Sequence, residues 1–170
     1  RSKDIELGGQ GAPLAPIYHQ FIIESLNLEL PSCILNIGGV ANLTFWDGKS
    51  LIGFDTGPGN ALMDNYIKTI SNKYFDKNGI LASKGIPNRE IINDFINNDF
   101  FKKTPPKSLD RNSFKDLYRE LLNQKMSSHD TMATLAEFTI ETIIIALKYL
   151  PEKIKSLLVT GGGYRNSYLM

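Results

Sequence analysis

Asp55 is the residue of this sequence best placed to do chemistry. It ends a short apolar strand predicted over 51–54 and opens the string DTGPGN at 55–60, a glycine-rich loop that packing alone does not require. A carboxylate at such a position can accept a proton from a hydroxyl group or from water, a role that contributes about 10²–10⁴-fold to a rate. On these residues alone the alternative stays open that Asp55 caps its own turn through a side-chain hydrogen bond.

Glycine-rich segments follow three of the predicted strands. They are Asn36-Ile37-Gly38-Gly39, Phe54-Asp55-Thr56-Gly57-Pro58-Gly59-Asn60 and Val159-Thr160-Gly161-Gly162-Gly163. Glycine lets backbone amides approach an anion without a Cβ in the way, and a helix that begins there adds the positive end of its dipole. The carboxyl ends of strands are also the rim where open α/β sheets bind ligands. The sequence holds no P-loop string of the type GxxxxGKS or GxxxxGKT, so we expect a different phosphate-binding fold.

Other residue patterns exclude several classes of site. His19 and His129 have no ligand partner at zinc spacing, so we expect no metal held by the chain itself. No serine lies in a nucleophile-elbow context. The pair Lys102-Lys103 beside Phe100-Phe101 is interpreted as a solvated helix end with its rings packed inward, rather than as a nucleic-acid site.

The elements that must position these residues follow from apolar spacing and turn signals. Strands are predicted over 32–37 and 40–46 around a Gly38-Gly39 hairpin turn, over 51–54, and, as a buried strand, over 157–160. Helices are predicted from near Pro13 to 28, after an Asn60 cap, over 91–95 and 114–122, and from the capping-box string at 127–130 until Pro151. A further helix is predicted to begin at Arg165-Asn166. This order of elements is typical of an α/β layer fold.

Composition bounds the function classes further. The chain has 170 residues, 42% hydrophobic and 22% charged, and a formal net charge of +1, which is typical of one globular domain and offers no field that would attract nucleic acid or an anionic membrane. The single cysteine, Cys33, lies in an apolar run, and its lack of a disulfide partner is compatible with a reducing cytosol. We therefore expect a cytoplasmic protein whose partners are small molecules.

Four strings together resemble one known family. DIELGGQGAPL from Asp4, LNIGGVANL from Leu35, GFDTGPGNALMD from Gly53 and VTGGGYRN from Val159 look like the middle of the anhydro-N-acetylmuramic acid kinases, and Pro105-Pro106-Lys107-Ser108 with Arg111 looks like a further element. This family belongs to the sugar kinase, Hsp70 and actin superfamily. The resemblance implies a partial ribonuclease-H-like, actin/hexokinase-type ATPase fold, with the end of an N-terminal lobe over 1–30 and an ATPase-like α/β lobe, truncated at its C-terminus, over 31–170.

The resemblance also implies a reaction and a role for each motif. Asp55 would be the base that activates water, which opens the 1,6-anhydro bridge while the freed O6 takes the γ-phosphoryl group of ATP, with Mg²⁺ as cofactor. The nucleotide-binding residues it implies are Asn36, Gly38, Gly39, Gly161, Gly162, Gly163 and Asn166. The substrate-binding residues it implies are Arg1, Gly9, Gln10, Gly11, Ala12, Pro13, Gly57, Gly59 and Asn60.

Two departures and two alternatives accompany this resemblance. The first phosphate loop of such kinases would lie before Arg1, and the helix after Gly163 is not completed, so we expect the 170-residue chain alone to show no turnover in a coupled ADP assay with the anhydro sugar. The intact protein could form a homodimer. The alternatives are another hexose or N-acetylhexosamine kinase, and an actin- or Hsp70-like nucleotide-binding protein without enzymatic activity.

Overall fold

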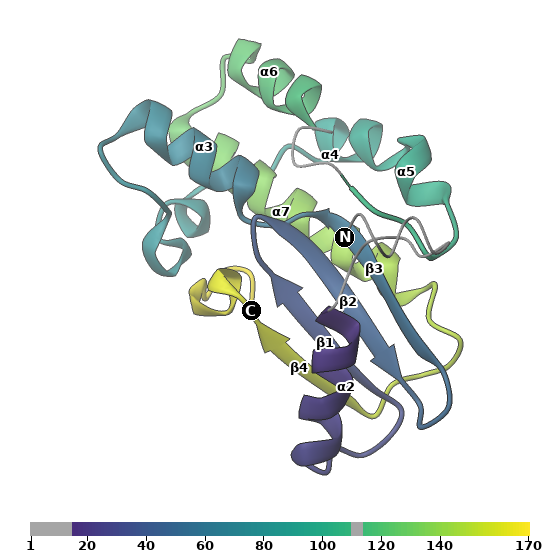
Figure 1. Ribbon diagram of the computed structural model, residues 1–170. Coiled ribbons are helices and arrows are strands. Elements are labelled where there is room, and N and C mark those ends of the chain that lie inside the picture. The colour runs from purple at the N-terminus through teal and green to yellow at the C-terminus, as the bar shows by residue number, and fades with distance from the viewer. Residues whose placement is uncertain (1–14, 110–113) are drawn as a thin grey trace, which may run out of the picture.

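A mixed four-stranded sheet forms the centre of the structure, a computed structural model that describes residues 15–109 and 114–170. The strand order is β3-β2-β1-β4. The strands are β1 (Ser32–Ile37), β2 (Val40–Trp46), β3 (Leu51–Pro58) and β4 (Ser156–Thr160). β1, β2 and β3 form an antiparallel meander, and β4 runs parallel to β1 (Figure 1). The mixed α/β class predicted from the sequence is confirmed.

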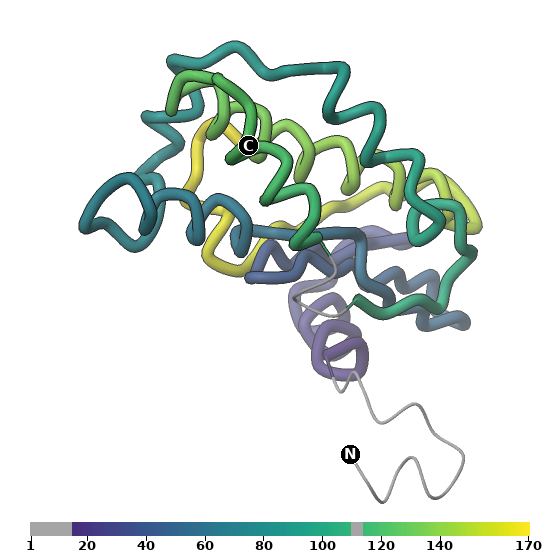
Figure 2. The backbone as a smooth tube through the Cα atoms, turned by 90° about the horizontal axis from the view of Figure 1, so that it is seen from above, coloured from purple at the N-terminus to yellow at the C-terminus, as the bar shows by residue number. Residues whose placement is uncertain are grey.

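Helices cover both faces of this sheet (Figure 2). One face carries α2 (Ala15–Ser25). The other is covered by α7 (Ser128–Leu147), around which the remaining helices pack. These are α3 (Ala61–Ile70), α4 (Arg89–Ile96), α5 (Asp99–Lys102) and α6 (Lys115–Asn123), together with the 3-10 helix Ala82–Lys84. Two further 3-10 helices are Lys77–Gly79 and Gly162–Arg165, the latter lying against β1 and β4.

The α7 side holds the hydrophobic core. Ser127 accepts a hydrogen bond from the amide of Asp130, so the predicted capping box starts α7. Phe138 of α7 is buried and packs edge to face on Phe101 and Phe114, which fixes α5 and α6 to it. Phe101 thus points inward, as the sequence predicts for this helix end.

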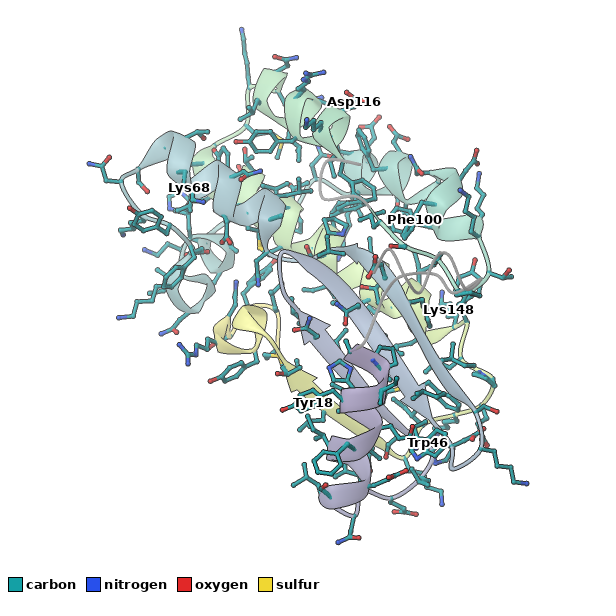
Figure 3. All side chains as sticks on the ribbon, viewed as in Figure 1. Tyr18, Trp46, Lys68, Phe100, Asp116 and Lys148 are labelled. Atoms are coloured by element: carbon teal, nitrogen blue, oxygen red, sulfur yellow. The ribbon has the colours of Figure 1, made fainter. Side chains whose placement is uncertain are left out.

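α2 turns an unexpected side to the sheet. Its apolar spacing predicts the helix correctly, yet Ile17, Tyr18 and Phe21 are 64%, 64% and 65% exposed (Tyr18 is labelled in Figure 3). The buried side carries His19, whose Nδ1 is hydrogen-bonded to Thr44 Oγ1 at 2.8 Å. The helix approaches this closely because Gly53 of β3 has no Cβ, and a Cβ there would meet the ring of Pro16. The sheet-facing side of α2 is therefore Pro16, His19 and Ile23, a different side from the one that its most apolar residues predict.

Two expected elements differ in the structure. β4 was expected to be a buried strand, but it lies at the edge of the described sheet and Leu157 is 45% exposed, since no described strand covers its outer side. The helix expected to begin at Arg165-Asn166 is instead a short 3-10 helix, Gly162–Arg165, which Asn166 terminates. None of the helices within 15–109 and 114–170 combines the length and apolarity needed to cross a membrane.

Candidate active site

One polar side chain from each strand forms a row across the sheet. In the strand register Asn36 lies opposite Asn42, Asn42 opposite Asp55, and Asn36 opposite Thr160. Opposite residues share a face with Cβ atoms about 4.5–5.5 Å apart, so Asp55 and Asn36 are brought onto one surface. All four side chains are partly exposed. Asn42 was missed in the sequence, because only the register of β2 reveals its place beside Asp55.

Asp55 lies within β3 rather than after its end. The predicted strand stops at 54, but the ladder with β2 continues through Ala41↔Gly57 and Val40↔Pro58. A register shift between Ala41 and Asn42 accommodates the extra residue Thr56, whose hydroxyl donates to the carbonyl of Ala41 at 3.2 Å. Asp55 therefore sits on a paired, hydrogen-bonded strand, a more rigid support than the loop expected from its glycines, and its side chain does not cap a local turn.

Two donors from a distant segment hold the Asp55 carboxylate. Oδ2 accepts a hydrogen bond from the amide of Leu109 at 2.7 Å and one from the hydroxyl of Ser108 at 3.2 Å. The Asp55 amide in turn donates to the carbonyl of Lys107 at 2.9 Å. In the sequence this segment is separated from Asp55 by the whole of α3, α4 and α5, and no local pattern assigns it a role beyond the family resemblance.

Desolvation decides the acidity of Asp55. Burial raises the pKa of the Asp55 carboxyl above its ordinary value, and the hydrogen bonds from Leu109 and Ser108 pull that pKa back down. Among the residues that the structure describes, no neighbouring charge shifts the pKa of Asp55. A carboxylate with a raised pKa is a stronger base than a solvated one, which suits proton transfer near neutral pH.

The first two glycine loops pack against each other. The carbonyl of Gly38 accepts from the Asn60 amide at 2.7 Å, and that of Gly39 accepts from the Gly59 amide at 3.0 Å. A Cβ on Gly59 would collide with the Gly38 carbonyl, whereas one on Gly39 would find only Ala61 at 3.9 Å. Of Gly39 and Gly59, Gly39 is therefore the glycine beside which a ligand has room.

Asn60 is held by a hydrogen bond to β1, and Gly57 lies close against α7. Asn60 occupies the N-cap position of α3 but makes no side-chain cap, and its Nδ2 donates to the carbonyl of Ile37 at 2.9 Å. The expected cap is therefore wrong, because the carbonyl end of β1 takes the amide group instead. A Cβ on Gly57 would lie 2.5 Å from Thr142 Oγ1 of α7. A part for Gly57, Gly59 or Asn60 in sugar binding stays a prediction.

The third glycine loop closes over the end of β1. Gly161 has a φ of 83°, and a Cβ there would lie 2.5 Å from Asn36 Oδ1 and 2.6 Å from the Ile37 carbonyl. Gly163 is similarly close to the Ile37 side chain. A Cβ on Gly162 would meet nothing nearer than Asn60 Nδ2 at 3.6 Å. The loop thus packs against Asn36 of the polar row and against Ile37, while the space beside Gly162 stays open.

A pocket of about 350 Å³ lies beside Gly162. The segment after α3 and the 3-10 helix Gly162–Arg165 both line this pocket. The two segments lie next to each other in the fold (Figure 1). Its lining joins three predicted site residues to seven others: Asn60, Gly162 and Asn166, with Met63, Asp64, Phe75, Asp76, Lys77, Asn78 and Arg165. Asn166 is 8% exposed and its Oδ1 accepts from the Tyr168 amide at 3.0 Å, so this side chain shapes the wall.

Several predicted residues fall outside the described part of the chain. These are Arg1, the loop residues Gly9, Gln10, Gly11, Ala12 and Pro13, and Arg111. Their roles remain expectations from the resemblance.

Comparison with known proteins decides the family. A family model described as anhydro-N-acetylmuramic acid kinase matches residues 1–170. The chain belongs to the anhydro-N-acetylmuramic acid kinase family. Membership accounts for the joint occurrence of the glycine-rich strings and Asp55 in one chain.

Curated members of the anhydro-N-acetylmuramic acid kinase family are similar to the chain along its whole length. The proteins of that name from Rhodopseudomonas palustris and Paramagnetospirillum magneticum are each 43% identical to it over 171 residues. The Zymomonas mobilis protein is 38% identical over 172 residues. The matches cover 100% of this chain but 46%, 47% and 46% of those three proteins, so the chain spans about half the length of its curated relatives.

Proposed function

We propose that the whole protein is an ATP-dependent kinase that hydrolytically opens 1,6-anhydro-N-acetylmuramic acid and phosphorylates it to N-acetylmuramic acid 6-phosphate. The observation that carries this proposal is the Asp55 carboxylate, partly desolvated on a rigid strand and aligned with Asn36 and Asn42 beside the glycine loops. The family named for this kinase activity matches the complete chain. The proposal includes a cytoplasmic location and a part in cell-wall recycling for the intact protein.

Asp55 would act as the general base of this reaction. Water attacks the anomeric carbon and gives one proton to the Asp55 carboxylate, while the bond from that carbon to O6 breaks. The electron pair left on O6 then forms the bond to the γ-phosphorus of ATP, and ADP leaves. Because Oδ2 already accepts two hydrogen bonds, the carboxylate is fixed in one orientation for this proton transfer.

The pocket beside Gly162 would take the nucleotide. Its volume of about 350 Å³ falls in the range of small-molecule sites, and Phe75 offers an apolar ring to a base. Gly39 and Gly162 have open space where a Cβ would stand, so their backbones can be approached by phosphate oxygens. Phosphoryl transfer needs positioning and charge neutralisation more than reactive side chains.

Mg²⁺ would neutralise charge on the triphosphate when bound. Magnesium at kinase sites is held mostly by substrate phosphates and water, with one or two carboxylates. Within residues 15–109 and 114–170, no group of three or more His, Cys, Asp or Glu side chains is arranged to hold a metal ion. We propose that the metal arrives with ATP and that the triphosphate and water supply most of its ligands.

The sheet supports a finer proposal for the fold. The order β3-β2-β1-β4, with β4 parallel to β1 and the other pairs antiparallel, is what we expect for a ribonuclease-H-like lobe of the sugar kinase, Hsp70 and actin superfamily. We propose that residues 31–170 contribute to this ATPase-like lobe and residues 1–30 to the end of the preceding one.

Product analysis tests the proposed function. The whole protein, incubated with ATP and the anhydro sugar in ¹⁸O-water, is expected to give a sugar 6-phosphate with a reducing end and with the label on its anomeric carbon, measured by mass spectrometry. An ordinary hexose kinase would leave the anhydro ring intact and the label in water. A phosphorylated sugar that retains the bridge would therefore contradict the proposal.

A further inference from the structure

Lys107 is a buried lysine whose ammonium group is turned away from solvent. The residue is 8% exposed, and Nζ donates to the carbonyls of Phe100 and Phe101 at 3.3 and 3.4 Å. These carbonyls belong to α5, where a cation also meets the negative end of the helix. Burial lowers the pKa of Lys107.

Two aromatic rings complete the surroundings of Nζ. It lies 5.0 Å from the ring centroid of Phe100, labelled on α5 in Figure 3, and 4.5 Å from that of Tyr149. The Tyr149 hydroxyl donates to the Phe101 carbonyl at 2.7 Å, so the ring that faces Nζ is itself anchored to α5. Within the described residues no carboxylate forms an ion pair with Lys107.

The residues that hold Asp55 continue directly from this lysine. The Lys107 carbonyl, the Ser108 hydroxyl and the Leu109 amide each bond to Asp55, yet 103–109 contains no helix or strand that could fix them. Their positions depend on whatever anchors the segment. The Lys107 side chain, tied to α5 and to Tyr149, is one of its anchors, beside the packing of Leu109 against the hydrophobic core and the hydrogen bond from the Asp55 amide.

We propose that Lys107 is a positioning residue for the base: it fixes the segment whose Ser108 hydroxyl and Leu109 amide orient the Asp55 carboxylate. The inference rests on the proposed function, because it takes Asp55 as the group that accepts the proton. It adds a residue that touches neither the reacting atoms nor the carboxylate with its own side chain.

The effect of Lys107 on Asp55 is mechanical rather than electrostatic. Within the described residues, the pKa of Asp55 is changed by its burial, by the Leu109 amide and by the Ser108 hydroxyl, and not by the charge of Lys107. The ammonium group itself faces the two α5 carbonyls and the rings of Phe100 and Tyr149. A loss of Lys107 should therefore act through displacement of the two donors.

Lys107→Met is the informative variant. Methionine keeps an unbranched apolar stem and removes the buried charge, and the α5 carbonyls retain other donors: Phe100 from the Lys103 amide, and Phe101 from Tyr149. Removing a desolvated charge without leaving an orphaned acceptor should not lower stability. Ser108→Ala removes one donor directly, and Lys103→Met, at an exposed lysine of the same segment, is the matched control.

In the whole kinase we expect Lys107→Met to lower kcat by about 10²-fold, the size of effect that a displacement of about 1 Å produces. KM for ATP should stay unchanged, because Nζ does not face the nucleotide pocket. Losing hydrogen bonds to the charged form raises the pKa of Asp55, so the acidic limb of the kcat/KM profile should move to higher pH. Ser108→Ala should give the same changes to a smaller extent, and Lys103→Met none.

NMR titration of the Asp55 carboxyl carbon separates this inference from the proposed function, because it needs no turnover. A higher Asp55 pKa in Lys107→Met and Ser108→Ala supports positioning even if the wild type proves inactive toward the anhydro sugar. An unchanged Asp55 pKa in Lys107→Met overturns the inference, as does a raised KM for ATP at unchanged kcat, which would make Lys107 a nucleotide ligand. A lower thermal midpoint with an unchanged pH profile would show that Lys107 has only a structural role. That outcome would also refute the inference.

Discussion

Replacing Asp55 with asparagine in the whole kinase lowers kcat for the anhydro sugar by about 10²–10⁴-fold, the contribution expected of a general base. Asparagine keeps an oxygen that can accept from Leu109 and Ser108 but cannot take a proton from water. ATP affinity should not change, because Asp55 does not line the pocket proposed for the nucleotide. Steady-state kinetics and ATP titration measure both quantities.

The stability of this variant provides its control. Since burial raises the pKa of Asp55 in the folded protein, the protonated form is favoured by folding. That contribution to stability is present below the unfolded pKa of about 3.9 and is lost as pH rises through the folded value. At neutral pH the wild type therefore carries a desolvated charge that asparagine lacks, and Asp55→Asn should unfold at the same or a higher temperature.

Two outcomes would count against the base assignment. Turnover within a few-fold of wild type would remove Asp55 from the chemistry. A lower unfolding temperature at neutral pH, together with lost ATP binding, would mean that Asp55 supports the fold rather than the reaction. Asn42→Ala changes the neighbouring position of the polar row. It should leave most of the turnover, because the Asn42 amide is not basic and does not accept the proton.

Local sequence patterns predicted the hairpin well. The bounds 32–37 and 40–46 agree with β1 and β2, because apolar runs on both sides of a Gly-Gly turn define strand ends within a few residues. The capping box of α7 is equally local. Such elements need only neighbours in sequence, so they could be derived without any knowledge of tertiary contacts.

Tertiary contacts account for what the sequence did not reveal. β3 extends past Asp55 only because β2 pairs with it beyond a bulge, and the fixation of Asp55 by Ser108 joins residues far apart in the chain. Asn60 looks like a helix cap by type but bonds the end of β1. The sequence thus singled out Asp55 as the candidate base, whereas the orientation of its carboxylate depends on long-range pairing that no local pattern encodes.

Gly161→Ala should destabilise the third glycine loop and thereby weaken ATP binding. Its φ of 83° with extended ψ is available to glycine and hardly to alanine, and the added Cβ would press on Asn36 Oδ1 and the Ile37 carbonyl. We expect the free energy of unfolding to fall by about 1–3 kcal/mol, the cost of one such strained backbone position. ATP affinity should fall as well, because the loop that borders the pocket is displaced from the end of β1.

Gly162→Ala is the matched control for that change, one residue along the same loop. Its Cβ would enter open space, with Asn60 Nδ2 at 3.6 Å as the nearest atom, so stability should match the wild type. Because that space is where we place the nucleotide, KM for ATP should rise while KM for the sugar stays constant. Thermal unfolding with and without ATP distinguishes the two variants. Equal stability of Gly161→Ala and wild type would contradict the strained loop, and unaltered ATP binding in Gly162→Ala would place the phosphates elsewhere.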